Sequence, residues 1–113
     1  VAHGLSNAML FPAVTAFSVA GAPGRYADCA RAYGVADATT SDQAAAGALV
    51  DALAALCAEL EVPTPRSYGI DSAAWQSLIP LMAEQAVASG SPANNPVIPG
   101  PAEIEALYAE VYG

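Results

Sequence analysis

Few side chains in this sequence can carry out chemistry, and they lie far apart along the chain. There is one histidine, His3, together with two cysteines, Cys29 and Cys57, and 11 Asp and Glu residues. Catalysis needs several such groups in one fixed arrangement. The sequence contains no nucleophile elbow, no Cys-x-x-Cys or His-Glu-x-x-His motif and no glycine-rich phosphate loop. A Ser-His-Asp triad stays open, because such triads are recognised by geometry. We therefore predict no complete catalytic or cofactor-binding site within these residues.

His3 is the best single candidate for a functional side chain. It precedes Gly4 at the start of the first predicted helix, where the positive end of the helix dipole favours a neutral imidazole that can bind a metal. A lone histidine is more often a surface or capping residue, and a metal site needs three or four ligands. Position alone leaves both interpretations of His3 open.

The elements that must position these residues are all helical. We predict an all-α fold, a compact bundle of about five to six helices, and no strand. The apolar periodicity, together with capping residues and proline and glycine breaks, gives these segments: about Leu5 to Phe17, Pro23 to Tyr33, a Thr40 or Ser41 cap to about Leu60, Asp71 or Ser72 to beyond Ala86, and about Ala102 to Tyr112.

Proline and glycine predict further details of the first two helices. The first is apolar nearly all round and should be kinked at Pro12, and Gly34 should end the second in a left-handed cap. Loops are expected at 62–69 and at 89–101, the latter with four prolines and two glycines in 13 residues. A loop of that length is usually functional or wraps a neighbour, although it could merely connect two helices.

Composition excludes several classes of protein. With 55% apolar and 12% charged residues the chain should fold, and 113 residues make one domain, which we assign to 1–113. The net charge is -8, and the cations are three arginines with no lysine. Nucleic acid and anionic membrane surfaces are therefore not expected partners.

The first 24 residues carry no charged side chain, which raises the question of a membrane span or a signal peptide. We expect neither, because polar residues and Pro12 interrupt the run and a basic leading segment is absent. Cys29 and Cys57 lie in alanine-rich helical sequence, so free buried thiols are favoured over a disulfide. These features predict a cytoplasmic protein.

The run from His3 to Pro12, HGLSNAMLFP, resembles the His-Gly-x-x-Asn-Ala-x-x-x-Pro segment of the iron-containing alcohol dehydrogenases. Weaker similarities follow in the family's order within 25–34, 62–71, 95–96 and 103–108. One departure is Val97, where the family has an arginine after Asn-Pro. The similarity extends along essentially the whole chain.

The resemblance implies the C-terminal helical domain of a longer oxidoreductase whose N-terminal nucleotide-binding domain is absent from these residues. Such enzymes interconvert a small alcohol and its aldehyde or ketone with NAD or NADP. They bind a divalent metal, iron or in some cases zinc, through one Asp and three His. His3 matches the last of these histidines, and its partners would lie upstream.

The resemblance also gives the second proline-rich loop a role, because the loop before Asn-Pro borders the substrate cavity in many family members. Ser91 and Asn95 are therefore candidate substrate-pocket residues. Alone, these 113 residues should be inactive and should bind neither metal nor nucleotide stably. The alternative hypothesis is a free-standing helical interaction or oligomerisation module. In either case we expect an exposed apolar patch, or self-association into a homo-oligomer, at the apolar helix after His3.

Overall fold

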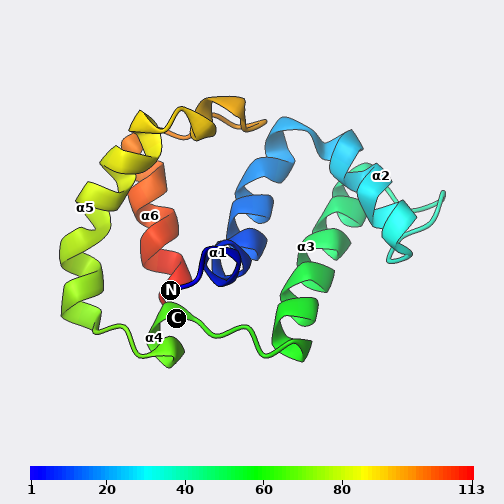
Figure 1. Cartoon of the computed structure of the whole chain (residues 1–113). Helices are drawn as coiled ribbons and strands as arrows, with labels where there is room; N and C mark the ends of the chain where they lie inside the picture. Colours follow the sequence, from blue (N-terminus) through cyan, green and yellow to red (C-terminus); the bar gives the residue numbers. More distant parts are fainter. The chain divides into compact units, whose positions relative to one another are not determined.

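The computed structural model describes all residues, 1–113, and every regular element is helical. The elements are α1 (His3–Ser18), η1 (Val19–Gly21), α2 (Pro23–Tyr33), α3 (Asp42–Glu59), α4 (Pro65–Tyr68), α5 (Ser72–Ala88), η2 (Ser91–Asn94) and α6 (Pro101–Val111), where η marks a 3-10 helix (Figure 1). The predicted all-α class and the helix number are confirmed. The chain divides into two compact units, Val1–Val62 and Pro63–Gly113, each of which is described separately.

In the first unit, α2 packs along α3, and α1 contacts α3 as well. The core between α2 and α3 consists of Ala27, Ala30, Ala45 and Leu49, with Tyr26 and Leu53 packed against it. The three alanines are fully buried. Because methyl groups occupy little space, the two helices can approach closely.

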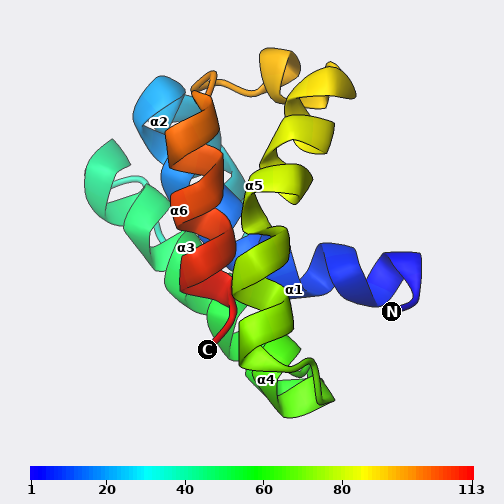
Figure 2. The same cartoon turned by 90° about the vertical axis from the view of Figure 1, so that its left-hand side faces the viewer.

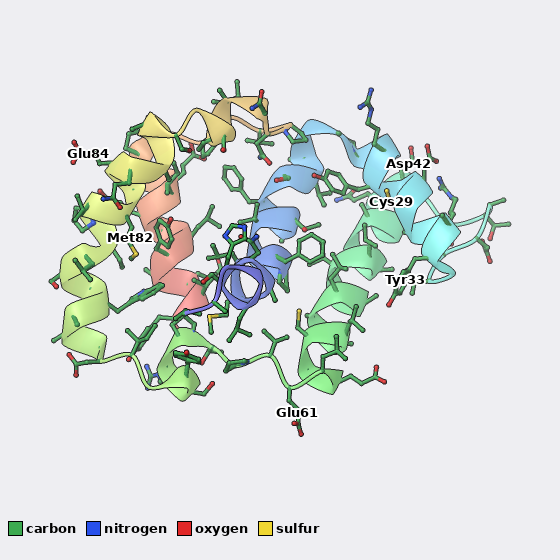
Figure 3. All side chains as sticks on the ribbon, viewed as in Figure 1. Cys29, Tyr33, Asp42, Glu61, Met82 and Glu84 are labelled. Atoms are coloured by element: carbon green, nitrogen blue, oxygen red, sulfur yellow. The ribbon has the colours of Figure 1, made fainter.

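Local sequence signals set the limits of these helices. The Ser41 hydroxyl accepts the N–H of Ala44 at 3.2 Å and caps α3, and Gly34 ends α2 with a φ of 91°. Pro12 lies inside α1, and the helix axis changes direction along α1 (Figures 1 and 2). The chain leaves α3 through Glu61, a non-glycine residue with a φ of 57°, whose side chain points away from the ribbon (Figure 3).

In the second unit, α5 and α6 lie side by side (Figures 1 and 2) and are joined by an aromatic cluster. The Trp75 indole lies 6.1 Å from the Tyr108 ring and 5.9 Å from the Tyr112 ring, centroid to centroid. The indole N–H also donates to the Tyr108 carbonyl at 2.9 Å. Asp71 caps α5 by accepting the N–H of Ala74 at 3.0 Å.

The C-terminal end of α6 is tied to the start of the second unit. The Tyr112 hydroxyl donates to the Ile70 carbonyl at 2.8 Å, and the Arg66 guanidinium lies 5.1 Å above the Tyr112 ring. The Arg66 N–H donates to the Tyr112 carbonyl at 3.1 Å. Tyr112 therefore makes three separate contacts with this segment.

Three expectations from the sequence need correction. Residues 65–68 form the short helix α4 rather than loop, because Thr64 and Ser67 cap each other reciprocally and Pro65 suits a first turn. Cys29 is exposed and Cys57 half-buried, although both are free as predicted. Residues 91–94 of the long loop form η2. Among the large apolar side chains of the helices, Tyr33, Leu60 and Leu78 are about half exposed or more.

Candidate functional site

His3 is the first residue of α1 and follows Ala2, whose backbone is extended. Its side chain is exposed. The Asn7 amide nitrogen lies 3.2 Å from His3 Nε2, four residues along the same helix face. An amide that donates to Nε2 pairs with the tautomer whose proton is on Nδ1. Asn7, which no sequence signal identified as a functional residue, therefore helps to orient the His3 ring in this structure.

The residues of this chain do not by themselves fit a metal ion. The structure contains no group of three or more His, Cys, Asp or Glu side chains that could hold one. A structural or catalytic metal site needs three or four protein ligands fixed together. His3 can supply a single imidazole, so further ligands would have to come from other residues.

The two candidate pocket residues lie together in the second unit, at either end of η2. The Ser91 N–H donates to the Ser89 hydroxyl at 3.3 Å, and the Ser91 side chain is exposed. The Asn95 amide nitrogen donates to the Val97 carbonyl at 2.7 Å and holds the backbone after η2. His3 belongs to the first unit, whereas Ser91 and Asn95 belong to the second.

An apolar cavity of about 420 Å³ lies between α5 and α6 in the second unit. No sequence pattern pointed to it, because its walls come from segments far apart in the chain. Its lining is mostly apolar, with the carboxylates of Glu84 and Glu105 as the charged members. It contains no nucleophile and no imidazole, so it shows no reactive group of its own. The residues that line it are Pro80, Ala83, Glu84, Val87, Ala88, Pro101 and Glu105.

The electrostatic contacts of the first unit are structural. Arg31 bridges Asp28 at 3.3 Å and Asp42 at 2.9 Å, and its hydrogen bond with Asp42 raises the pKa of the guanidinium. In Figure 3, Asp42 lies beside α2. Arg31 also donates to the carbonyls of Asp37 and Thr40, so it fastens the loop between α2 and α3 to both helices.

The expected apolar patch on the helix after His3 is confirmed. In α1 only Thr15 and Ser18 are buried, while Phe11 is 52% exposed and Val14 is 37% exposed. The segment His3–Gly21 is long and apolar enough to cross a membrane, by length and composition only. Core helices of soluble proteins and signal sequences have the same length and composition.

Comparisons with known proteins place this chain. A family model described as "Fe-containing alcohol dehydrogenase family, C-terminal" matches residues 1–112. A 1,3-propanediol dehydrogenase from Citrobacter freundii is 30% identical over 111 residues, which are 97% of this chain and 28% of that protein. A crystal structure of a 1,3-propanediol oxidoreductase superposes with a TM-score of 0.88 at 28% identity, over 98% of this chain and 28% of the other.

The chain thus spans just over a quarter of the length of these relatives, and the matched family model is C-terminal. That match extends from the segment that begins at His3 through the end of α6. The resemblance drawn from the HGLSNAMLFP run is confirmed. The protein belongs to the iron-containing alcohol dehydrogenase family and corresponds to its C-terminal helical part.

Proposed function

We propose that this chain is the metal-binding C-terminal part of an alcohol dehydrogenase that interconverts a small alcohol and its aldehyde or ketone with NAD or NADP. The family match over residues 1–112 carries this proposal, and it favours the dehydrogenase over a free-standing interaction module. The names of the two relatives point to short diols among the substrates.

In this proposal, His3 donates one ligand to a divalent metal, iron or zinc. The structure contains no complete ligand group, and the proposal assigns the remaining ligands to a segment upstream in the full enzyme. The contact from the Asn7 amide occupies the lone pair on Nε2, so His3 must release Asn7 or change its tautomer when it binds the metal. The 113 residues alone are then inactive and hold metal weakly, because affinity depends on several ligands fixed together.

Ser91 and Asn95 are proposed to border the substrate. The hydrogen bond from Asn95 to the Val97 carbonyl fixes the backbone at the position where the family resemblance implies an arginine. We also propose a cytoplasmic location, which the two free cysteines support because a reducing compartment keeps thiols unpaired.

The proposal can be tested with a fusion enzyme. The upstream part of the Citrobacter freundii 1,3-propanediol dehydrogenase is joined to this chain in place of the C-terminal region that it matches. We expect NADH formation from 1,3-propanediol after iron is added, and none from the 113 residues alone. His3→Ala should lower bound iron and turnover by more than about 100-fold. This loss is larger than the one usually seen when a residue that only hydrogen-bonds to a metal ligand is replaced.

Tyr33→Phe is the matched control, since Tyr33 is exposed on α2 and is not one of the proposed site residues. It should leave iron content and turnover unchanged. A folded fusion enzyme that retains full iron and turnover after His3→Ala would refute the role of His3. Turnover by the isolated 113 residues would refute their proposed dependence on an upstream segment.

A further inference from the structure

The bend of α1 deprives one backbone carbonyl of its usual hydrogen bond. Pro12 has no N–H, so it cannot donate to the carbonyl of Ala8, its partner in a regular helix. The proline ring also pushes that carbonyl away from its regular position. The helix axis changes direction along α1 (Figures 1 and 2). Because Ala8 is half-buried, its carbonyl needs another donor.

The side chain of Cys57 on α3 supplies a donor. The Cys57 Sγ lies 3.8 Å from the Ala8 carbonyl oxygen, in the geometry of a thiol hydrogen bond. The two residues are 49 positions apart in the sequence, so the packing of α1 against α3 brings them together. Cys57 is half-buried and forms no disulfide. A thiol is a weak donor, and here it meets an acceptor that has lost its helical N–H.

The backbone of Cys57 is itself held in place. α3 ends in a Schellman motif, in which the Val62 N–H donates to the Cys57 carbonyl at 2.8 Å and the Glu61 N–H donates to the Ala58 carbonyl at 3.1 Å. Glu61 has the left-handed conformation that this motif requires, with a φ of 57°. Cys57 is therefore fixed at the end of α3, and its side chain can hold α1 rather than follow it.

The fixed thiol and the bent helix together suggest a role for Cys57. We infer that Cys57 is a positioning residue, because its thiol replaces the N–H that Pro12 lacks and so fixes the direction of the N-terminal half of α1. That half carries His3, the candidate functional residue of the first unit, and its contact Asn7. A change of direction at Pro12 would move both side chains. The effect on turnover rests on the proposed function, whereas the hydrogen bond and the bend do not.

Apolar packing is the competing explanation for the contact. Free cysteines often act as small apolar side chains, and Cys57 could fill space against α1 in that way. The two explanations differ for Cys57→Ser, because a hydroxyl keeps the donor but is a poorer apolar filler than a thiol. Serine should be better than alanine at this position if the hydrogen bond matters, and no better than alanine if only packing does.

The first test is a double-mutant cycle in urea unfolding of the 113-residue chain. Pro12→Ala restores the N–H for the Ala8 carbonyl and should make the thiol dispensable. Cys57→Ala should therefore raise the unfolding equilibrium constant about threefold more in the unaltered chain than in Pro12→Ala. Cys29→Ala, at the exposed thiol of α2, is the matched control and should have the same effect in both. Additive effects of Cys57→Ala and Pro12→Ala would overturn the inference.

The second test measures the bend itself. Residual dipolar couplings of the backbone N–H bonds give the angle between the two halves of α1, residues 3–11 and 13–18, in the 113-residue chain. Cys57→Ala should change this angle, and Cys57→Ser should restore it. An unchanged angle in Cys57→Ala would overturn the inference. A serine variant whose angle matches that of the alanine variant would also overturn it.

The fusion enzyme tests the consequence for turnover. Cys57→Ala should lower turnover several-fold and Cys57→Ser should recover most of it, while Cys29→Ala should have no effect. Unchanged turnover in the Cys57→Ala fusion enzyme would overturn the positioning role. A fusion enzyme that is inactive before any substitution would instead refute the proposed function, and the cycle and the angle would still decide the inference.

Discussion

The two units of this protein hold their helices together in different ways. In the first, α2 and α3 meet through fully buried alanines, and the largest well-buried side chain in the cluster is Leu49. In the second, α5 and α6 meet through Trp75, Tyr108 and Tyr112, whose rings also carry hydrogen-bond donors. We call the α2–α3 contact the alanine joint and the α5–α6 contact the aromatic joint. The alanine joint depends on the close approach of two helices, and the aromatic joint depends on a few contacts between large side chains. The two joints should therefore fail under opposite substitutions.

The largest expected effect is in the aromatic joint. Trp75→Ala removes two ring contacts and the hydrogen bond to the Tyr108 carbonyl, and it should destabilise the second unit by about 3 kcal/mol, at the low end for large aromatic truncations. Hydrogen–deuterium exchange should show lost protection in α5 and α6. Trp75→Phe keeps a ring and should cost less than half as much. Equal losses for the two variants would show that the ring contacts contribute little.

The alanine joint should fail when a side chain is enlarged. Ala30→Leu adds three heavy atoms at a fully buried position, and it should cost about 2 kcal/mol through overpacking. The control is Ala32→Leu, the same change at an exposed position of the same helix, which should be nearly neutral. Urea unfolding monitored by circular dichroism measures both. If Ala30→Leu leaves the stability unchanged, then α2 and α3 can move apart without a loss of stability.

Replacing the glycine that ends a helix should cost the same stability in both units. Gly34 ends α2 with a φ of 91°, and Gly69 ends α4 with a φ of 107°, and a Cβ at either position would meet no neighbour within 4 Å. Alanine at either position should therefore cost a similar amount, about 1 kcal/mol, from backbone strain alone. Gly47→Ala, inside α3, should instead stabilise the protein slightly. Clearly unequal costs at Gly34 and Gly69 would contradict a purely local origin.

The smallest expected effect is electrostatic and lies beside the alanine joint. Hydrogen bonds from the Thr39 side chain, the Thr39 N–H and the Thr40 side chain lower the pKa of Asp37. A lowered pKa in the folded state adds stability above the ordinary value of about 3.9, and this stability is lost as the pH falls through the folded pKa. Thr39→Val should raise the pKa of Asp37, and Thr40→Val should raise it less. NMR titration of the Asp37 carboxyl carbon measures both, and an unchanged value in Thr39→Val would refute the assignment.

Local signals made most of the helices predictable. The ends at Ser41, Asp71 and Gly34 depend on residues within one turn, and each lies where the sequence places it. The short helix α4 was not predicted, because its reciprocal cap involves only Thr64 and Ser67 within a proline-rich segment. Periodicity showed which residues share a face but not which faces have a neighbour. Tyr33 shares a helix face with the buried Ala30, and Leu60 with the buried Leu49, but Tyr33 and Leu60 are themselves exposed.

The candidate site was harder to predict from the sequence than the helices were. His3 gained its role from the family resemblance, because one imidazole without partners says nothing about a metal. The contact with Asn7 could have been found from the spacing of four residues, and the cavity between α5 and α6 could not, since its walls come from distant segments. The roles of Ser91 and Asn95 stay predictions that the fusion enzyme can test.

The alanine core has an entropic consequence. An alanine methyl group has no rotamers to lose on folding, whereas each long side chain that is immobilised costs up to about 2 kcal/mol at 25 °C. The joint between α2 and α3 gains little apolar area per residue, but almost nothing besides the backbone has to be ordered when it forms. The aromatic joint must instead fix the ring torsions of Trp75, Tyr108 and Tyr112 before their contacts exist. Side-chain order should therefore be set by the backbone alone in the α2–α3 joint and by mutual ring packing in the α5–α6 joint.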